Sequence, residues 1–329
     1  MKTSVPRTPR RLALSACAAV ALAAPSSAAA AELADLHVEA NGRALVPGLS
    51  FETGTTNIRT SKFGPGCNGT GDRRRLKGAT AMGALIDAAA VRPALRPLRI
   101  SDEFDFGLLV CGVAKALSSG AGSFWLYKVN HVSPEVGGDQ LEIDSGDEVL
   151  WYFSDSERGR NTGDELDILA PVRARAGKDL RVRVVSYDAA GRRKPAARAK
   201  VSFGRQEVAA DRRGVATLRT RGAGELRLRA RRGKDIPSPI ARVCVAETLR
   251  RCSPVRGKRI FGATRRDVLR GTKGPDVINA GGGNDRIDVR GGRRDVVRCG
   301  RGRDRVRATR ADRVARDCEV VNGKARRRG

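Results

Sequence analysis

The stretch GTKGPDVINAGGGNDRIDVRGGRRDVVRCGRGRDRV, from Gly271 to Val306, lies within a repeat of about nine residues. Aspartate recurs at steps of 9, 9, 10, 9 and 8, at Asp267, Asp276, Asp285, Asp295, Asp304 and Asp312. Two residues after each comes an aliphatic side chain: Leu269, Ile278, Ile287, Val297, Val306 and Val314. So short a period indicates units of one turn and one short strand, with the aliphatic side chains stacked inward. We expect a parallel β-roll or β-solenoid over residues 257–320, followed by a basic tail over 321–329.

Glycines precede these aspartates by two or four residues and are best preserved at Gly281, Gly283, Gly300 and Gly302. Glycine tolerates turn conformations that a Cβ would resist. The pattern resembles a degenerate form of the G-G-x-G-x-D-x-U-x motif of the calcium-binding RTX repeat family. The resemblance implies that aspartate carboxylates and turn carbonyls bind calcium between repeats n and n+2. It places on one edge Asp267, Asp285 and Asp304, and on the other Asp276, Asp295 and Asp312.

This region departs from the family in its charge, since residues 248–329 hold 25 basic and 9 acidic residues. Arg293 replaces a turn glycine, and three further arginines lie beside the expected ligands: Arg294, Arg301 and Arg303. Repulsion by several such charges could abolish calcium binding. The alternative is that arginine pairs with aspartate across the turns and takes the place of the ion.

The first 31 residues predict a secretory signal peptide. A basic start is followed by a short apolar run from Leu12 to Ala24 and by small residues up to Ala31. This order is typical of a leader that is cleaved, here before Glu32. A rival interpretation is a lipobox at 14–17, which would acylate Cys17. No later segment is apolar enough to span a membrane, so we expect a secreted, extracellular or cell-surface protein.

Six of the seven cysteines follow the leader and form three local pairs: Cys67 with Cys111, Cys244 with Cys252, and Cys299 with Cys318. An even number in an exported chain indicates disulfides. Cys299–Cys318 would cap the repeat. No C-x-x-C motif is present, which argues against a zinc site or thioredoxin-like chemistry.

The net charge of +28 is unevenly distributed. Residues 32–165 hold 14 basic and 19 acidic residues, whereas residues 166–329 hold 46 basic and 17 acidic residues. A surface this basic attracts polyanions, and outside a cell these are anionic cell-envelope polymers or other surface polyanions. The alternative is a generic solvated surface, in which the excess of arginine over lysine reflects a GC-rich genome.

Residues 32–155 predict an α+β domain. Alternating residues at 36–40 lead into an Asn41-Gly42 hairpin turn. Residues 80–91 have helical spacing, with Thr80 as a candidate cap. Two aromatic strands are expected at Phe124–Val129 and at Val149–Phe153.

The segment SFWLYKVNHVSPEVGGDQLEIDSGDEVLWYFSD resembles the transcobalamin-like C-terminal domain family, a bacterial domain of unknown function. Four residues match its first strand motif: Trp125, Tyr127, Val129 and Asn130. Four match its second: Gly146, Asp147, Val149 and Trp151. His131 stands where that family has glycine, so the turn after Asn130 is expected to differ. The alternatives for the aromatic residues are a packed core and a ligand-binding face made by Trp125, Tyr127, Asn130 and Trp151. The helical barrel that supplies much of the cobalamin site in transcobalamins has no counterpart here.

Residues 156–167 and 248–256 are predicted linkers. Between them, residues 168–247 show short alternating strands separated by glycine-containing turns, which favours an all-β sandwich. The motifs ADRRGVATLR and GELRLRAR resemble bacterial immunoglobulin-like surface modules, which act as spacers.

We expect no enzymatic activity. The two histidines, His37 and His131, have no metal-ligand spacing, and the acidic cluster Asp102, Glu103 and Asp105 is typical of a solvated turn. The favoured function is a secreted or cell-surface binding or structural protein. A soluble small-molecule capture protein is the alternative, with its ligand unknown, and an unrecognised extracellular enzyme comes third.

Overall fold

A computed structural model describes residues 31–64, 67–119, 122–292 and 294–325. The predicted leader, apart from Ala31, and Cys17 lie outside these residues, as does Arg293. The chain is largely β, with several sheets and, among the described residues, one α-helix, α1 (Ala81–Val91). No helix of the described part is long and apolar enough to cross a membrane.

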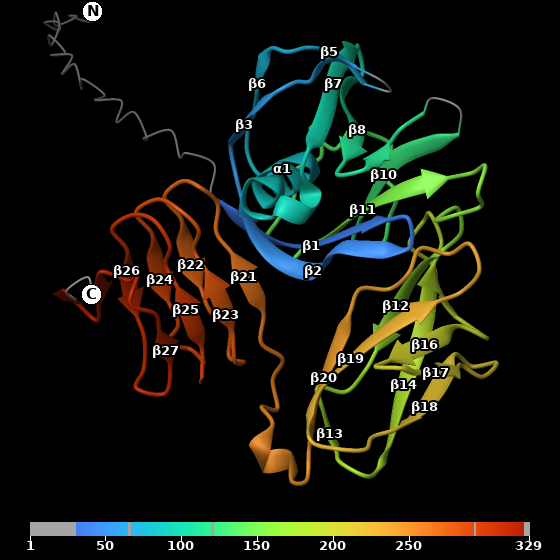
Figure 1. The fold of residues 1–329 in the computed structure, drawn as a ribbon, viewed down its shortest axis with the longest axis vertical. Coiled ribbons are helices and arrows are strands. Elements are labelled where there is room, and N and C mark those ends of the chain that lie inside the picture. The colour runs from blue at the N-terminus through green and yellow to red at the C-terminus, as the bar shows by residue number, and fades with distance from the viewer. Residues whose placement is uncertain (1–30, 65–66, 120–121, 293, 326–329) are drawn as a thin grey trace, which may run out of the picture.

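Residues 32–155, the front region, surround α1 with strands (Figure 1). The strands are β1 (Glu32–Ala40), β2 (Arg43–Thr53), β3 (Thr56–Arg59), β4 (Lys62–Gly64), β5 (Cys67–Thr70), β6 (Arg73–Leu76), β7 (Leu98–Phe104), β8 (Gly107–Val113), β9 (Ala116–Leu117), β10 (Ser123–Val129) and β11 (Glu148–Asp155). A short 3-10 helix, η1 (Pro93–Leu95), follows α1. The predicted hairpin is confirmed, because Asn41 and Gly42 join β1 to β2 with φ of 50° and 73°.

The predicted helix and its cap are also confirmed. The Thr80 hydroxyl accepts a hydrogen bond from the Gly83 N–H at 3.0 Å, which satisfies one of the free donors of the first turn. Met82 and Leu85 are buried against the sheet β10-β11-β1-β2. The two aromatic strands are β10 and β11, paired antiparallel.

Residues 165–247, the middle region, form a four-stranded and a five-stranded sheet that share one core. The strands are β12 (Glu165–Leu169), β13 (Arg173–Arg175), β14 (Asp179–Tyr187), β15 (Arg193–Pro195), β16 (Lys200–Phe203), β17 (Gln206–Ala209), β18 (Val215–Arg219), β19 (Gly224–Arg231) and β20 (Ala241–Ala246), followed by the 3-10 helix η2 (Leu249–Arg251). β12 begins inside the predicted linker 156–167. Its alternating side chains Leu166 and Ile168 are buried in this core, so the region starts earlier than the sequence suggested.

Residues 257–325, the repeat region, form two parallel ladders (Figure 1). One contains β21 (Arg259–Phe261), β23 (Val277–Asn279), β25 (Val296–Arg298) and β27 (Arg313–Val314). The other contains β22 (Val268–Arg270), β24 (Arg286–Asp288), β26 (Arg305–Arg307) and β28 (Val320–Val321), with β29 (Lys324–Ala325) paired antiparallel at its end. β29 lies in the predicted basic tail, so part of that tail is a strand. The repeated aliphatic residues line the core between the ladders, and Ile260 adds a rung.

The first ladder continues the sheet of the front region. β21 pairs in parallel with β2, placing Ser50 opposite Ile260 and Phe51 opposite Phe261. The rings of Phe51 and Phe261 stack with centroids 5.1 Å apart. One sheet of eight strands thus runs from the front region into the repeat region.

The middle region contacts the other side of the front region. Leu150 and Tyr152 of β11 form a small buried cluster with Ile236. Glu39, fully buried on β1, forms an ion pair with Arg229 of β19. The front region therefore contacts both of the others.

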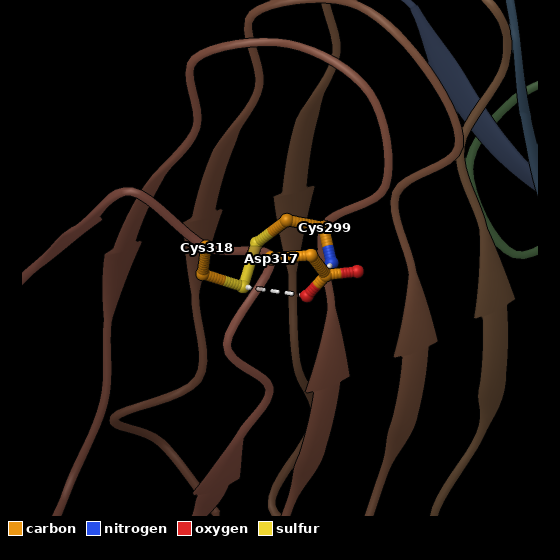
Figure 2. Close-up of side chains that lie close together, drawn as sticks. All are labelled: Cys299, Asp317 and Cys318. Carbon is orange, nitrogen blue, oxygen red and sulfur yellow. Dashed lines mark hydrogen bonds between the residues drawn. A yellow bond between two sulfur atoms is a disulfide. The ribbon is translucent and has the colours of Figure 1, made fainter. Parts of the chain in front are cut away.

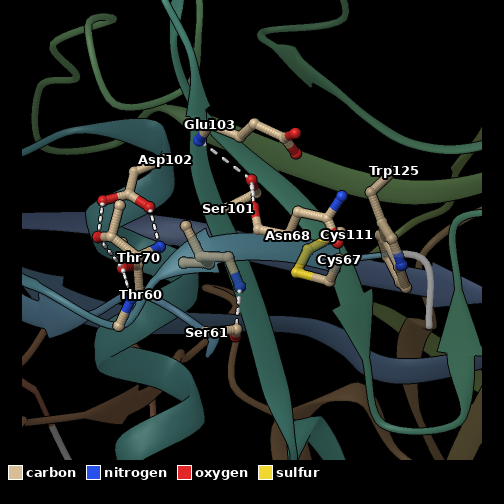
Figure 3. Close-up of a disulfide and its surroundings, with 12 residues drawn as sticks. Thr60, Ser61, Cys67, Asn68, Thr70, Ser101, Asp102, Glu103, Cys111 and Trp125 are labelled. Atoms are coloured by element: carbon tan, nitrogen blue, oxygen red, sulfur yellow. Dashed lines mark hydrogen bonds between the residues drawn. A yellow bond between two sulfur atoms is a disulfide. The ribbon is translucent and has the colours of Figure 1, made fainter. Parts of the chain in front are cut away.

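All three predicted disulfides are present. Figure 3 shows Cys67–Cys111, which joins β5 to β8 beside Trp125. In the same view, the carboxylate of Asp102 accepts hydrogen bonds from the N–H and hydroxyl of Thr70. Asp102 also pairs with Arg74. These contacts assign Asp102 a role in holding the turn.

Candidate metal centre in the carboxylate ladders

One edge of the repeat region carries a ladder of aspartates in the turns before β22, β24 and β26. The backbone N–H of Asp267 donates to Oδ1 of Asp285 at 2.9 Å, and the N–H of Asp285 donates to Oδ1 of Asp304 at 2.8 Å. The N–H of Asp304 donates in turn to Oε2 of Glu319 at 2.9 Å. Each carboxylate therefore fastens the backbone of the neighbouring turn in its ladder.

The opposite edge repeats this arrangement. The N–H of Asp276 donates to Oδ1 of Asp295 at 2.7 Å, and the N–H of Asp295 donates to Oδ1 of Asp312 at 3.0 Å. The N–H of Lys258 donates to Oδ1 of Asp276 at 2.6 Å. The two edges hold the alternate aspartates that the sequence placed on them.

These carboxylates are unusually buried. Five aspartates are at most 1% exposed: Asp267, Asp276, Asp285, Asp295 and Asp304. Three of their buried oxygens have no hydrogen-bonding partner among the described residues: Asp267 Oδ1, Asp285 Oδ2 and Asp295 Oδ2. An unsatisfied buried carboxylate oxygen is costly, and a bound ion is a common reason for one.

The raised pKa values of the ladder aspartates also favour a bound cation. Burial, together with the charges of Asp267 and Asp304, raises the pKa of Asp285 to about 7. Burial raises the pKa of Asp267 to about 6, and burial with the charges of Asp276 and Asp312 raises that of Asp295 to about 6. Stacked carboxylates repel one another, and a cation between them would relieve that repulsion.

The predicted glycines stand where two turns approach each other closely. All four have positive φ: Gly281, Gly283, Gly300 and Gly302. A Cβ on Gly283 would lie 2.3 Å from the carbonyl oxygen of Arg265, and one on Gly300 would lie 2.0 Å from that of Gly281. Only glycine lets the backbone carbonyl of a neighbouring turn come this near to its Cα.

The four aromatic-strand residues lie elsewhere, in the front region. Trp125 and Trp151 are 3% and 2% exposed, and their indole N–H groups donate to the carbonyls of Ala116 and Ala81. Tyr127 stacks on Trp151 at 4.8 Å. The side chain of Asn130 accepts from the N–H of Glu148 and donates to Asp147. This placement favours a packing role, and their ligand-binding role stays a prediction.

Two short parts of the chain match known families. Residues 261–296 match the RTX calcium-binding nonapeptide repeat (4 copies). Residues 110–155, which contain the aromatic strands, match a domain of unknown function (DUF4430). Searches of curated proteins and of solved structures return no match. The RTX prediction is thus confirmed for 261–296, whereas the likenesses to transcobalamin and to immunoglobulin-like modules stay predictions.

The residues of this RTX repeat fit the calcium that such repeats typically bind. Calcium takes six to eight oxygen ligands from carboxylates and backbone carbonyls. The aspartate ladders offer buried carboxylate oxygens without partners, beside glycines that a backbone carbonyl of a neighbouring turn approaches closely. The candidate ligands are therefore the carboxylates of Asp267, Asp285 and Asp295, with Asp276 and Asp304 stacked in the same ladders.

Arginine does not take the place of the ion at these three unpartnered oxygens. Arg265 pairs with Asp87 of α1, and Arg290 pairs with Asp288 on the outer face of β24. Arg294, Arg301 and Arg303 are exposed. These three exposed arginines lie outside the aspartate ladders, where water screens their charge, whereas the half-buried Arg265 attracts Asp267 through space.

A separate grouping of Cys299, Asp317 and Cys318 lies near the C-terminal end of the repeat (Figure 2). The two sulfur atoms are joined in a disulfide, so neither is a thiolate ligand. The carboxylate of Asp317 accepts from the backbone N–H of Cys299 and of Gly300. This grouping therefore closes the repeat and offers no metal site.

Two acidic residues on the edge that carries Asp267, Asp285 and Asp304 do not match the aspartate motif. Glu319 takes the place of an aspartate at the last rung, and the sequence Glu319-Val320-Val321 preserves the spacing of carboxylate and aliphatic residue. Glu52 comes from β2, and its Oε1 accepts from the N–H of Val268 at 3.5 Å. A motif that allows glutamate as well as aspartate would have found Glu319, but no local pattern points to Glu52.

Proposed function

We propose that the chain is an exported, non-enzymatic binding or structural protein whose C-terminal RTX repeat is a β-roll stabilised by calcium. The observation that carries the proposal is the pair of buried aspartate ladders, with three carboxylate oxygens that no described residue satisfies. The match of residues 261–296 to a calcium-binding repeat supports it. The front α+β region presents a binding face, and the middle region serves as an immunoglobulin-like spacer.

Three disulfides support export, because such bonds persist mainly outside the cytoplasm. Extracellular calcium is abundant enough to occupy sites of modest affinity. An RTX repeat whose stacked carboxylates repel one another without calcium would become fully stable only after export.

Calorimetric titration of calcium into the oxidised, chelator-stripped full chain tests the proposal. We expect binding, and we expect Asp285→Asn to weaken it by at least about 10-fold, since loss of groups around a bound metal costs this much or more. Asp288→Asn is the matched control, because Asp288 pairs with Arg290 outside the ladder. Absence of binding to the parent chain would refute the proposal.

A second function, binding of anionic polymers, is favoured by a cleft between the middle and repeat regions. The cleft has a volume of 1220 Å³. One acidic residue, Glu225, lines it beside ten basic ones: Arg242, Arg250, Arg251, Arg256, Lys258, Arg259, Lys273, Arg290, Arg294 and Arg310. Burial and the charge of Arg242 lower the pKa of Arg259, so positive charges already repel each other there. A chain of phosphates or carboxylates would relieve this repulsion.

Binding of linear polyphosphate, measured over a range of salt concentrations, tests this second function. We expect the triple substitution Arg259→Ser, Arg294→Ser and Arg310→Ser to abolish most of the binding. The control substitutes three exposed arginines of the middle region: Arg205→Ser, Arg212→Ser and Arg221→Ser. Equal losses in both variants would show that only overall charge matters.

A further inference from the structure

The end of β2 brings a glutamate from the front region to the first turn of the RTX repeat. Glu52 is 5% exposed, although it lies outside the repeat in sequence. Its Oε1 accepts from the backbone N–H of Val268 at 3.5 Å, the residue that follows Asp267. Its Oε2 is buried and has no hydrogen-bonding partner among the described residues. Glu52 therefore resembles one more rung of the ladder, supplied by another region.

Asp267 lies next to this glutamate with an unpartnered oxygen of its own. Oδ2 of Asp267 accepts from the N–H of Ala263 at 2.5 Å, whereas Oδ1 is buried and unsatisfied. Burial, and after it the charge of Asp267, raises the pKa of Glu52 to about 7. The next rung, Asp285, also contributes to this repulsion. Three buried acidic side chains thus repel one another at this junction.

Arg265, a cation at this junction, is already hydrogen-bonded to another carboxylate. The Nη1 and Nη2 atoms of Arg265 contact Oδ1 and Oδ2 of Asp87 at 3.0 and 3.3 Å. Asp87 also accepts from the hydroxyls of Thr53 and Thr56, so its carboxylate is fully used. Arg265 also attracts Glu52 and Asp267 through space, but its hydrogen bonds go to Asp87, so one guanidinium faces more carboxylates than it can neutralise.

We infer that Glu52 and Asp267 hold a divalent cation at the junction of the front and repeat regions. This site rests on the proposed function, in which the ion is calcium, and adds a ligand that lies outside the nonapeptide motif. Two buried carboxylate oxygens, each without a partner and contributed by different regions, suit a hard cation. Since β2 and β21 pair beside them, ion binding locks the repeat to the edge of the front sheet.

Hydrogen–deuterium exchange of the full oxidised chain, with and without calcium, tests this inference. We expect calcium to slow exchange at Ser50–Thr53 and at Ile260–Val268 in the parent chain and in Asp295→Asn, which alters the opposite edge. We expect Glu52→Gln to lose this protection while keeping the response at the opposite edge. Calcium titration should show the junction site weakened by at least about 10-fold in Glu52→Gln.

A comparison in chelator separates a lost ligand from a lost fold. Glutamine keeps the shape of the side chain and removes a charge that Asp267 repels, so Glu52→Gln should melt at or above the temperature of the parent chain without calcium. Added calcium should raise the melting temperature of this variant by less than it raises that of the parent chain. A variant that melts lower in chelator would show that Glu52 is held by something other than an ion, and would overturn the inference.

The two proposals fail in different ways. If the parent chain binds no calcium, both the proposed function and this site are wrong. If it binds calcium and Glu52→Gln keeps the same number of ions, affinity and exchange response, only the junction site is wrong.

Discussion

Oδ1 of Asp285 accepts a hydrogen bond from the backbone N–H of Asp267 at 2.9 Å, across 18 residues of sequence. Through this contact, the side chain of one repeat holds the backbone of the repeat two units earlier. It uses one carboxylate oxygen and leaves Oδ2 of Asp285 buried without a partner. The same carboxylate can therefore hold the turns together and face an ion.

The aliphatic core of the RTX repeat should dominate its stability. Ile278 is fully buried between the ladders, whereas its neighbour Val277 is 37% exposed. We expect Ile278→Ala to lower the free energy of unfolding by about 2–5 kcal/mol, because it leaves a cavity. Val277→Ala should cost less than about 1 kcal/mol. Urea unfolding measures both, and similar losses would contradict the assigned inward face.

The disulfide near the end of the repeat should stabilise the fold more than the disulfide that closes the middle region. Cys299–Cys318 spans 19 residues, and Cys244–Cys252 spans 8. Closing the longer loop removes more entropy from the unfolded chain, so replacing both cysteines by alanine should cost about 2–4 kcal/mol. The Cys244→Ala, Cys252→Ala pair should cost less. A larger loss from the shorter loop, in unfolding without reductant, would contradict this ranking.

The contact between the front and middle regions should depend on pH through His131. This residue has a φ of 70°, and its ring stacks on Tyr187 with centroids 3.7 Å apart. Its Nδ1 lies 2.9 Å from Glu165. Burial of the ring opposes the charged form, but the hydrogen bond and charge of Glu165, with the charges of Glu148 and Asp167, raise the pKa of His131 above its usual value.

A raised histidine pKa stabilises the fold at low pH and loses that contribution as pH rises through the folded-state pKa. The stability difference between the parent chain and His131→Gln should therefore be larger at about pH 6 than at about pH 9. Urea unfolding at both pH values measures it. Glu207→Gln, on an exposed strand of the middle region, is the control. A difference that does not change with pH would contradict the role of His131.

The fold could be predicted from sequence where the signal is local. The nine-residue period located the ladders, Thr80 located the start of α1, and cysteine spacing gave three disulfides. β12 was missed because acidic residues alternate with Leu166 and Ile168, so the segment looked like a polar linker. Alternation of this kind also marks a strand with one buried face.

The site was predictable only in part, because some of its groups come together through tertiary contacts. Glu52 lies 216 residues from Val268, whose N–H it accepts, so only the pairing of β2 with β21 brings it to the repeat. Trp125 and Trp151 show the same limit. Their strands were predictable, but whether the rings pack inward or face a ligand depends on where α1 lies.

The central claim, that the ladders of the RTX repeat hold calcium, is tested most directly by diffraction from crystals of the full chain grown with calcium. Anomalous signal from calcium locates each ion. We expect peaks within coordination distance of Asp285 on one edge and Asp295 on the other, at about 2.3–2.6 Å from carboxylate oxygens. Ladders without a peak, with arginine guanidinium groups bound to those oxygens, would contradict it.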